Sequence, residues 1–342
     1  MNIRQLAWWN RQPTLWSHSV PTMELIPRDD DEITFGTPPL SIEPLNMDFD
    51  GDTSAIYLNH DIDALKQMYD HAFIQNTVFY DAKDDCLSTI RHEALYAAYI
   101  LTHGFEEFEG KLFKNIDDLQ NLPEDLDLFN DSLNAAVSVN GTKYTYGVCL
   151  FNKWCGFNKV LINQPVTKKQ IQLVSKTIYE NGGCDSKKYY DQLFELERTL
   201  MSFITLTKHI PSLSLFEMVS LVNDDNHELI NRIPSGNAYL SYHINNALTD
   251  RCVEDFPHES SLYKLFKSGS RFSKVQLARS CINIGLLADE NNVVDPVPIN
   301  SSLITGLTPE QFFQSAPEMY LVQYKYIILF KISISRYRVK RL

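Results

Sequence analysis

Three aspartates at alternate positions are the clearest candidates for chemistry in this chain. They are Asp48, Asp50 and Asp52, within residues 46–52, which read Asn-Met-Asp-Phe-Asp-Gly-Asp. In an extended or tightly turned loop, residues i, i+2 and i+4 point to one side, so the three carboxylates can converge on one point. Carboxylates at such short distances repel one another unless a cation neutralises their charge. Hard oxygen ligands without His or Cys suit Mg²⁺, which keeps positions open for water and phosphates. The pattern predicts a Mg²⁺ site for phosphoryl or nucleotidyl transfer.

Two other interpretations of this loop are a calcium site and a plain surface turn. A calcium-binding EF-hand loop needs Gly at position six and Glu at position twelve. Here the glycine, Gly51, is fourth and Asn59 is twelfth, so the calcium interpretation fails on spacing. An acidic surface turn is common and would account for an Asp-x-Asp alone. The full string, with Asn46 before it and strands expected on both sides, favours the metal site.

The elements that must position the loop are predicted to be strands. Residues 23–26, 32–35 and 53–58 have the apolar and β-branched character of short strands, so the loop is expected on a β scaffold. A helix with an apolar stripe over residues 62–73 follows, with Asp61 as its N-cap. A second helix is predicted over residues 91–102.

The rest of the chain is mostly helical by pattern. Residues 105–134 are acidic and are expected to form a solvated, partly helical surface segment, and Asn140-Gly141 predicts a hairpin. One helix is predicted to begin with a capping box at Thr167 and Gln170 and to end at Gly182-Gly183. Apolar stripes predict two more helices, over residues 193–203 and 273–287, and Thr308-Pro309 predicts the start of another helix.

Composition narrows the class of protein. The chain has 342 residues, a formal net charge of −12 and a pI of about 5.2, so bulk charge alone does not bind it to nucleic acid. Six cysteines are scattered without a C-x-x-C pair, which indicates reduced thiols and no zinc site. The sequence has neither a signal peptide nor an apolar run of transmembrane length, so no membrane contact is expected. We expect a cytoplasmic protein, in the host cell if it is viral.

Five motifs in one order resemble the largest (beta-prime) subunit of multisubunit DNA-directed RNA polymerases. Residues 46–52 resemble its NADFDGD signature, with Met47 in place of the usual Ala. Residues 10–15 resemble its N-R-x-P-T-L motif, and residues 90–102 resemble its P-S-Q-D-x-x-L-G-x-Y-x-L-T helix. Residues 268–276 are similar to its S-G-A-R/K-G-S-x-x-Q stretch, and residues 306–313 are similar to the run that opens its bridge helix.

The resemblance implies a fold and roles for named residues. The fold class is mixed α+β: the second half of a double-psi β-barrel, followed by mostly helical pore, funnel and F-loop regions. Asp48, Asp50 and Asp52 would hold the catalytic Mg²⁺, with a second Mg²⁺ arriving on the nucleotide. Arg11 and Asn46 would face the ribose of the incoming nucleotide.

The resemblance also divides the chain into five segments. They are a barrel portion with the metal loop (1–60), a helical or mixed segment (61–129), a pore-like domain (130–222), shortened rim helices with the F-loop (223–300), and the start of a bridge-helix region with a divergent C-terminus (301–342).

The departures from the family indicate a fragment. The clamp, zinc ribbon, lid, first barrel half and trigger loop of the family have no counterpart here, and residues after Tyr320 do not resemble a bridge helix. Split subunits of this kind resemble those of large bacteriophages. The expected partners are therefore other beta and beta-prime fragments, a DNA template, RNA product and nucleoside triphosphates. Two alternatives are a truncated, non-catalytic piece and a single-chain, two-barrel RNA polymerase.

Overall fold

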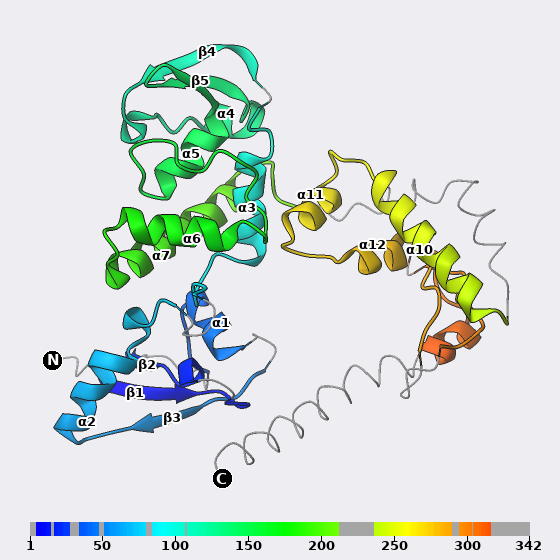
Figure 1. The fold of residues 1–342 in the computed structure, drawn as a ribbon, viewed down its shortest axis with the longest axis horizontal. Coiled ribbons are helices and arrows are strands. Elements are labelled where there is room, and N and C mark those ends of the chain that lie inside the picture. The colour runs from blue at the N-terminus through cyan, green and yellow to red at the C-terminus, as the bar shows by residue number, and fades with distance from the viewer. Residues whose placement is uncertain are drawn as a thin grey trace. The chain divides into compact units, whose positions relative to one another are not determined.

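The chain folds into two compact units, Met1–His209 and Ile210–Leu342 (Figure 1). The computed structural model describes residues 5–14, 17–27, 34–47, 51–79, 84–106, 108–211, 236–288, 294–302 and 304–315. Both helices and small sheets are present, so the predicted mixed α+β class is confirmed at that level. The double-psi barrel and the five-segment division stay predictions. Within the described ranges, no helix is long and apolar enough to cross a membrane.

The first unit begins with a three-stranded antiparallel sheet in the order β2-β1-β3. Its strands are β1 (Gln5–Asn10), β2 (Thr22–Leu25) and β3 (Ala55–Leu58). Alternation along β1 buries Ala7 and Trp9 and leaves Trp8 exposed. The strands predicted at 23–26 and 53–58 are thus confirmed. Of the strand predicted at 32–35, the first two residues lie outside the described ranges and the last two belong to no strand.

A short helix, not a strand, precedes the acidic loop. The 3₁₀ turn η2 (Pro39–Ser41) leads into α1 (Ile42–Leu45). Pro44 lies in the first turn of α1, where a backbone N–H has no intrahelical partner, so the proline is tolerated. Asn46 ends the helix in the left-handed conformation (φ 46°, ψ 46°), which Asn adopts more readily than most residues. The expected strand–loop–strand arrangement is therefore helix–loop–strand.

The helix predicted after β3 is present, but its apolar stripe is only partly buried. It comprises α2 (Ile62–Gln67) and a π-helical turn, η3 (Met68–Ala72), and is followed by η4 (Ile74–Asn76). Asp61 caps α2 as predicted, accepting a hydrogen bond from the Ala64 N–H at 2.8 Å. Met68 is buried, whereas Ile62 is 81% exposed.

A second small sheet, in the order β4-β5-β6, belongs to the same unit. β5 (Ala135–Val139) and β6 (Thr142–Thr145) form the predicted hairpin, with Asn140 and Gly141 both at positive φ. Strand β4 (Glu109–Ile116) pairs with β5 in parallel and was not predicted. Among the described residues of the segment expected to be a partly helical surface, only η5 (Leu119–Asn121) and α4 (Leu126–Asp131) are helical.

Four helices complete the described part of this unit. They are α3 (His92–Thr102), α5 (Tyr146–Trp154), α6 (Ile171–Asn181) and α7 (Ser186–Leu206). The α7 stripe is buried as predicted at Leu193, Leu196, Leu200 and Phe203. The capping box predicted at Thr167 is wrong, because α6 begins at Ile171 and its N-cap, Gln170, makes no side-chain cap bond. The Thr167 hydroxyl instead contacts the Gln170 side chain.

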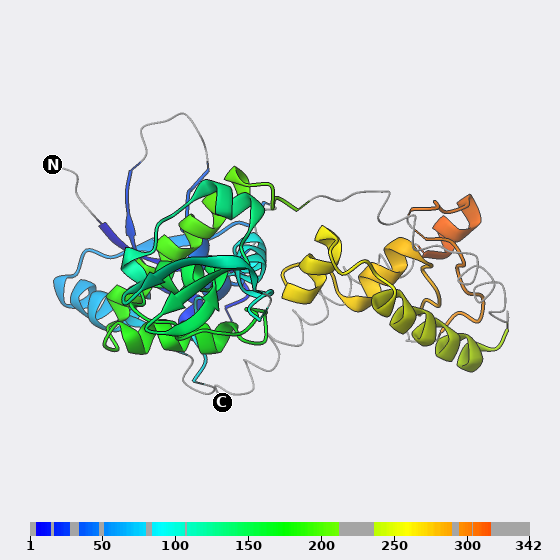
Figure 2. The same cartoon turned by 90° about the horizontal axis from the view of Figure 1, so that it is seen from above.

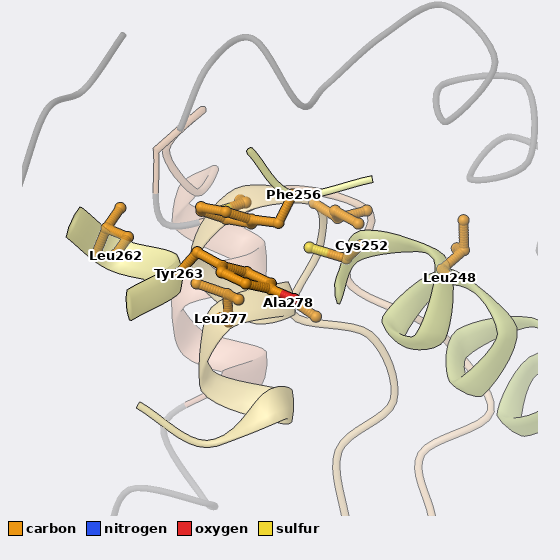
Figure 3. Packing of buried hydrophobic residues seen from close by; sticks show 9 residues of the cluster. Leu248, Cys252, Phe256, Leu262, Tyr263, Leu277 and Ala278 are labelled. Carbon is orange, nitrogen blue, oxygen red and sulfur yellow. The ribbon is translucent and has the colours of Figure 1, made fainter. Parts of the chain in front are cut away.

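The second unit is built around α10 (Ala238–Glu254), α11 (Ser261–Ser268) and α12 (Lys274–Cys281). Figure 2 shows α12 beside α10, and Figure 3 shows side chains from all three helices and Phe256 packed into one core. Helix α12 ends at Cys281, so the predicted helix to 287 is too long, and Val275, expected inward, is 50% exposed. The start predicted at Thr308 is confirmed by reciprocal bonds between Thr308 and Gln311.

Candidate functional site

The guanidinium of Arg11 reaches both ends of the acidic loop. Its Nη1 donates to the backbone carbonyl of Asn46, and its Nη2 lies 2.9 Å from Oδ1 of Asp52. The two charged side chains are only 19% and 20% exposed, so this ion pair is stronger than one on the open surface. Three of the five predicted site residues therefore meet at one place.

Strand pairing explains why Arg11 lies there. Asn10, the last residue of β1, is opposite Ala55, the first residue of β3. Arg11 therefore leaves the sheet next to the residues that lead into β3, which include Asp52. Behind it, the Thr14 hydroxyl donates to the side-chain oxygen of Asn10 at 2.5 Å and ties the following turn to the strand.

The start of the loop is fixed in the core beneath the sheet. The Met47 N–H donates to the Ile42 carbonyl at 2.9 Å, and the Met47 side chain is 7% exposed among Trp9, Met23 and Leu45. Because Trp9 lies on β1, the same strand that leads into Arg11 also holds the loop's first residues. Both ends of the loop are thus tied to one sheet.

Gly51 gives the end of the loop its shape. Its φ is 110°, a conformation that residues with a side chain rarely adopt, and a Cβ at this position would meet no atom within 4 Å. Backbone conformation, and not lack of space, therefore requires glycine here. Asp48 and Asp50 lie outside the described residues. Of the predicted metal ligands, the structure places only Asp52.

No group of three or more metal-ligating residues is found in the described part of the chain, which contains one of the three loop aspartates. All six cysteines are free. Burial raises the pKa of the Cys86 and Cys281 thiols to about 11, so both thiols are neutral near pH 7. The absence of a zinc site stays a prediction.

Sequence reasoning missed the Arg11–Asp52 ion pair. It assigned Arg11 to the nucleotide ribose and Asp52 to the metal, and did not connect them. The two residues are separated by 41 positions, so no local spacing signals their contact. The pairing of the strands that end at Asn10 and begin at Ala55 could have indicated it.

No protein-family model matches the chain. Among curated proteins, it is similar to the DNA-directed RNA polymerase subunit beta' of Fusobacterium nucleatum, with 22% identity over 90% of this chain and 24% of that protein. The subunit beta' of Rickettsia bellii is 24% identical over 91% of the chain, and that of Aquifex pyrophilus 21% over 90%.

The chain is related to the beta' subunit of DNA-directed RNA polymerase. The resemblance carried by the five ordered motifs is thereby confirmed. This beta'-related chain spans 24%, 26% and 21% of the length of those three relatives. The similarity includes both units, since it extends over nine tenths of the chain.

Proposed function

We propose that this chain is a catalytic-core fragment of a multisubunit DNA-dependent RNA polymerase, in which residues 46–52 form the Mg²⁺ loop for nucleotidyl transfer. The observation that carries the proposal is the contact of Arg11 with both Asn46 and Asp52, since it joins two motifs of the beta' resemblance in one half-buried ion pair. Other beta and beta' fragments, DNA template, RNA and nucleoside triphosphates are the proposed partners.

The donor set of the loop fits Mg²⁺. Asp48, Asp50 and Asp52 supply hard carboxylate oxygens at alternate positions, on a loop whose two ends are fixed. When bound, Mg²⁺ lowers the pKa of a coordinated hydroxyl and neutralises phosphate charge, which is the chemistry that RNA chain extension needs. We assign all three aspartates as metal ligands.

Arg11 and Asn46 are proposed to face the ribose of the incoming nucleotide. A guanidinium has five N–H donors, so the contacts with Asn46 and Asp52 use only part of its capacity. Fixing Asp52 by a charged hydrogen bond also orients its carboxylate before the metal arrives. Arg11 is therefore both a substrate contact and a positioning residue in this proposal.

The test is the substitution Asp50→Ala in the assembled polymerase. We expect RNA synthesis to be abolished, because loss of one of three carboxylates removes a metal ligand, while co-purification with the partner fragments is unchanged. Asp63→Ala is the matched control, since Asp63 is an exposed aspartate in the first turn of α2 and should not affect synthesis.

Two results would contradict the proposal. Normal elongation by Asp50→Ala would refute the metal assignment. A wild-type chain that assembles with polymerase fragments but adds nothing to RNA synthesis would identify a non-catalytic piece. We also expect the isolated chain to be inactive, because its net charge of −12 leaves most nucleic-acid contacts to its partners.

A further inference from the structure

A groove of about 960 Å³ lies on the first unit, apart from the acidic loop. Neither Arg11 nor any described residue of the loop lines it. Its walls come from four parts of the chain: β1 and β2 of the first sheet together with Ile56, residues 34–41, residues 73–75, and residues 190–195 on α7. The groove is therefore built by elements far apart in sequence within one unit.

Several large apolar side chains of the groove are exposed. Ile26 is 71% exposed, Phe35 41% and Phe194 45%. Phe35 also packs edge-on against Trp9, with ring centroids 4.6 Å apart, so it forms a continuous apolar surface with the groove wall. A contiguous exposed apolar surface of this kind indicates an interaction site.

Trp9 supplies a second, independent observation. It lines the groove and is 4% exposed, yet its indole N–H has no hydrogen-bond partner among the described residues. Buried indole N–H groups are normally paired. Trp9 therefore brings an unpartnered donor to the wall of the groove.

Charge defines the chemistry of the occupant. Within the described part of the chain, the charged residues that line the groove are Glu24, Asp191 and Glu195, and all three are acidic. Glu195 is paired on the surface with Arg198 at 2.6 Å, and Glu24 also has an interaction partner. An occupant that carries Lys or Arg beside its apolar side chains complements this lining, whereas an acidic one is repelled.

The backbone of the groove favours an extended occupant. Strand β2 is the edge of its sheet as far as the structure describes it, and Met23, Glu24, Leu25 and Ile26 line the groove. Thr22 already forms a bridge with Phe73, so an added strand would pair with residues after Thr22. An exposed edge can hydrogen-bond to an added strand, while alternate side chains of that strand enter the apolar surface.

We propose that this groove binds an extended segment of another polypeptide in which apolar side chains alternate with Lys or Arg. The inference goes beyond nucleotidyl transfer, since it concerns a surface that the acidic loop does not use. It rests on the proposed function only in that an assembled polymerase would supply such a partner. A failure of either proposal leaves the test of the other unaffected.

The test uses the full chain and two fluorescein-labelled peptides of about ten residues, ~33 Å when extended. One alternates Leu with Lys, and the other alternates Leu with Glu. Fluorescence anisotropy should show binding of the Leu/Lys peptide only. Asp191→Lys and Phe194→Lys, both at exposed positions of α7, should each weaken that binding about tenfold or more.

Two variants on α6 serve as matched controls. Glu180→Lys makes the same change in net charge as Asp191→Lys, and Leu173→Lys makes the same kind of apolar-to-charged change as Phe194→Lys. Both residues are exposed and neither lines the groove. Each control should bind the Leu/Lys peptide within about twofold of the wild-type chain. Circular dichroism should show the wild-type fold in all four variants.

Three outcomes would overturn the proposal. The first is equal affinity for the two peptides, and the second is a loss of affinity in Glu180→Lys as large as that in Asp191→Lys. The third is self-association in sedimentation velocity that Phe194→Lys abolishes, without peptide binding, which would assign the groove to a second copy of this chain.

Discussion

Gly51 is the residue whose backbone conformation most directly shapes the acidic loop. An alanine at φ 110° costs about 1–3 kcal/mol, and no neighbouring atom adds to that cost, since none lies within 4 Å of the added Cβ. We expect Gly51→Ala to relax the loop and move its carboxylates. In the assembled polymerase, the rate of RNA synthesis should fall about tenfold or more, and the Mg²⁺ concentration that gives half-maximal rate should rise.

Gly183 provides the control for this strain. It too has a positive φ, 77°, with no atom within 4 Å of an added Cβ, but it follows α6. Gly183→Ala should therefore lower the free energy of unfolding by a similar amount and leave RNA synthesis unchanged. Equal losses of synthesis in the two variants would show that general strain, and not loop geometry, is responsible.

Glu197 on α7 should make stability depend on pH. Burial raises the pKa of its carboxyl from 4.5 to about 7. Between these values the folded state holds more protons than the unfolded state, so the free energy of unfolding falls as the pH rises from 4.5 through 7. We expect Glu197→Gln to remove this contribution and to be more stable than the wild-type chain at pH 8.

Denaturation at pH 5 and pH 8 measures the effect of Glu197. The matched control is Glu180→Gln, which removes an exposed carboxylate from α6. The control should keep the pH dependence of the wild-type chain. The free energy of unfolding of Glu197→Gln could fall from pH 5 to pH 8 by as much as that of the wild-type chain. The carboxyl of Glu197 would then not be the group that makes stability depend on pH.

At the scale of residues, the sequence indicates which side chains could act but not how they contact one another. Alternate spacing singles out Asp48, Asp50 and Asp52, because side-chain direction in an extended segment is a local property. The contact between Arg11 and Asp52 depends on which strands pair, and that is decided by packing far along the chain.

Gly147 sets the distance between two helices of the first unit. A Cβ on Gly147, in α5, would lie 2.3 Å from the backbone oxygen of Leu101 in α3. Since the obstacle is backbone, no side-chain rotation can relieve it. We expect Gly147→Ala to push α3 and α5 apart and to reduce the free energy of unfolding by about 1–3 kcal/mol.

The control for helix packing is Gly182→Ala. Gly182 has an ordinary φ of −73°, and its nearest neighbours would lie 3.4 Å from an added Cβ. Chemical denaturation should show a change of less than about 0.5 kcal/mol for this variant. A Gly147→Ala variant as stable as Gly182→Ala would mean that α3 and α5 can separate at no cost.

At the scale of elements, local patterns predict helices better than strands. The stripe of α7 repeats at helical spacing, and its buried face was predicted correctly. Strand β4 reads Glu-Gly-Lys-Leu-Phe-Lys-Asn-Ile, which lacks clear alternation, and it forms because β5 offers a parallel partner. Helix α1 was missed because Pro44 suggests a break, although the first turn tolerates proline.

At the scale of the molecule, the order of motifs identified the family where no single feature did. Each motif alone is short, but five in the same order extend over most of the chain, and the similarity to beta' subunits covers the same extent. The division into two units was not predicted, because the boundary after His209 depends on which helices pack together.

Each of the two units has buried apolar residues of its own, so we expect a mutation in one unit to leave the other folded. Phe256 is 1% exposed in the core of the second unit, and Phe151 is fully buried in the first. Phe256→Ala should cost about 3–5 kcal/mol. We expect hydrogen exchange to become faster in α10, α11 and α12, and to stay unchanged in α3, α5 and α7.

The reciprocal variant completes this experiment. Phe151→Ala should speed hydrogen exchange in α3, α5 and α7 and leave it unchanged in α10, α11 and α12. The reason is that Phe151 is not among the residues that form the core of the second unit. Mass spectrometry of peptides from each helix separates the two responses. If either substitution loosens all six helices together, the two units unfold cooperatively as one.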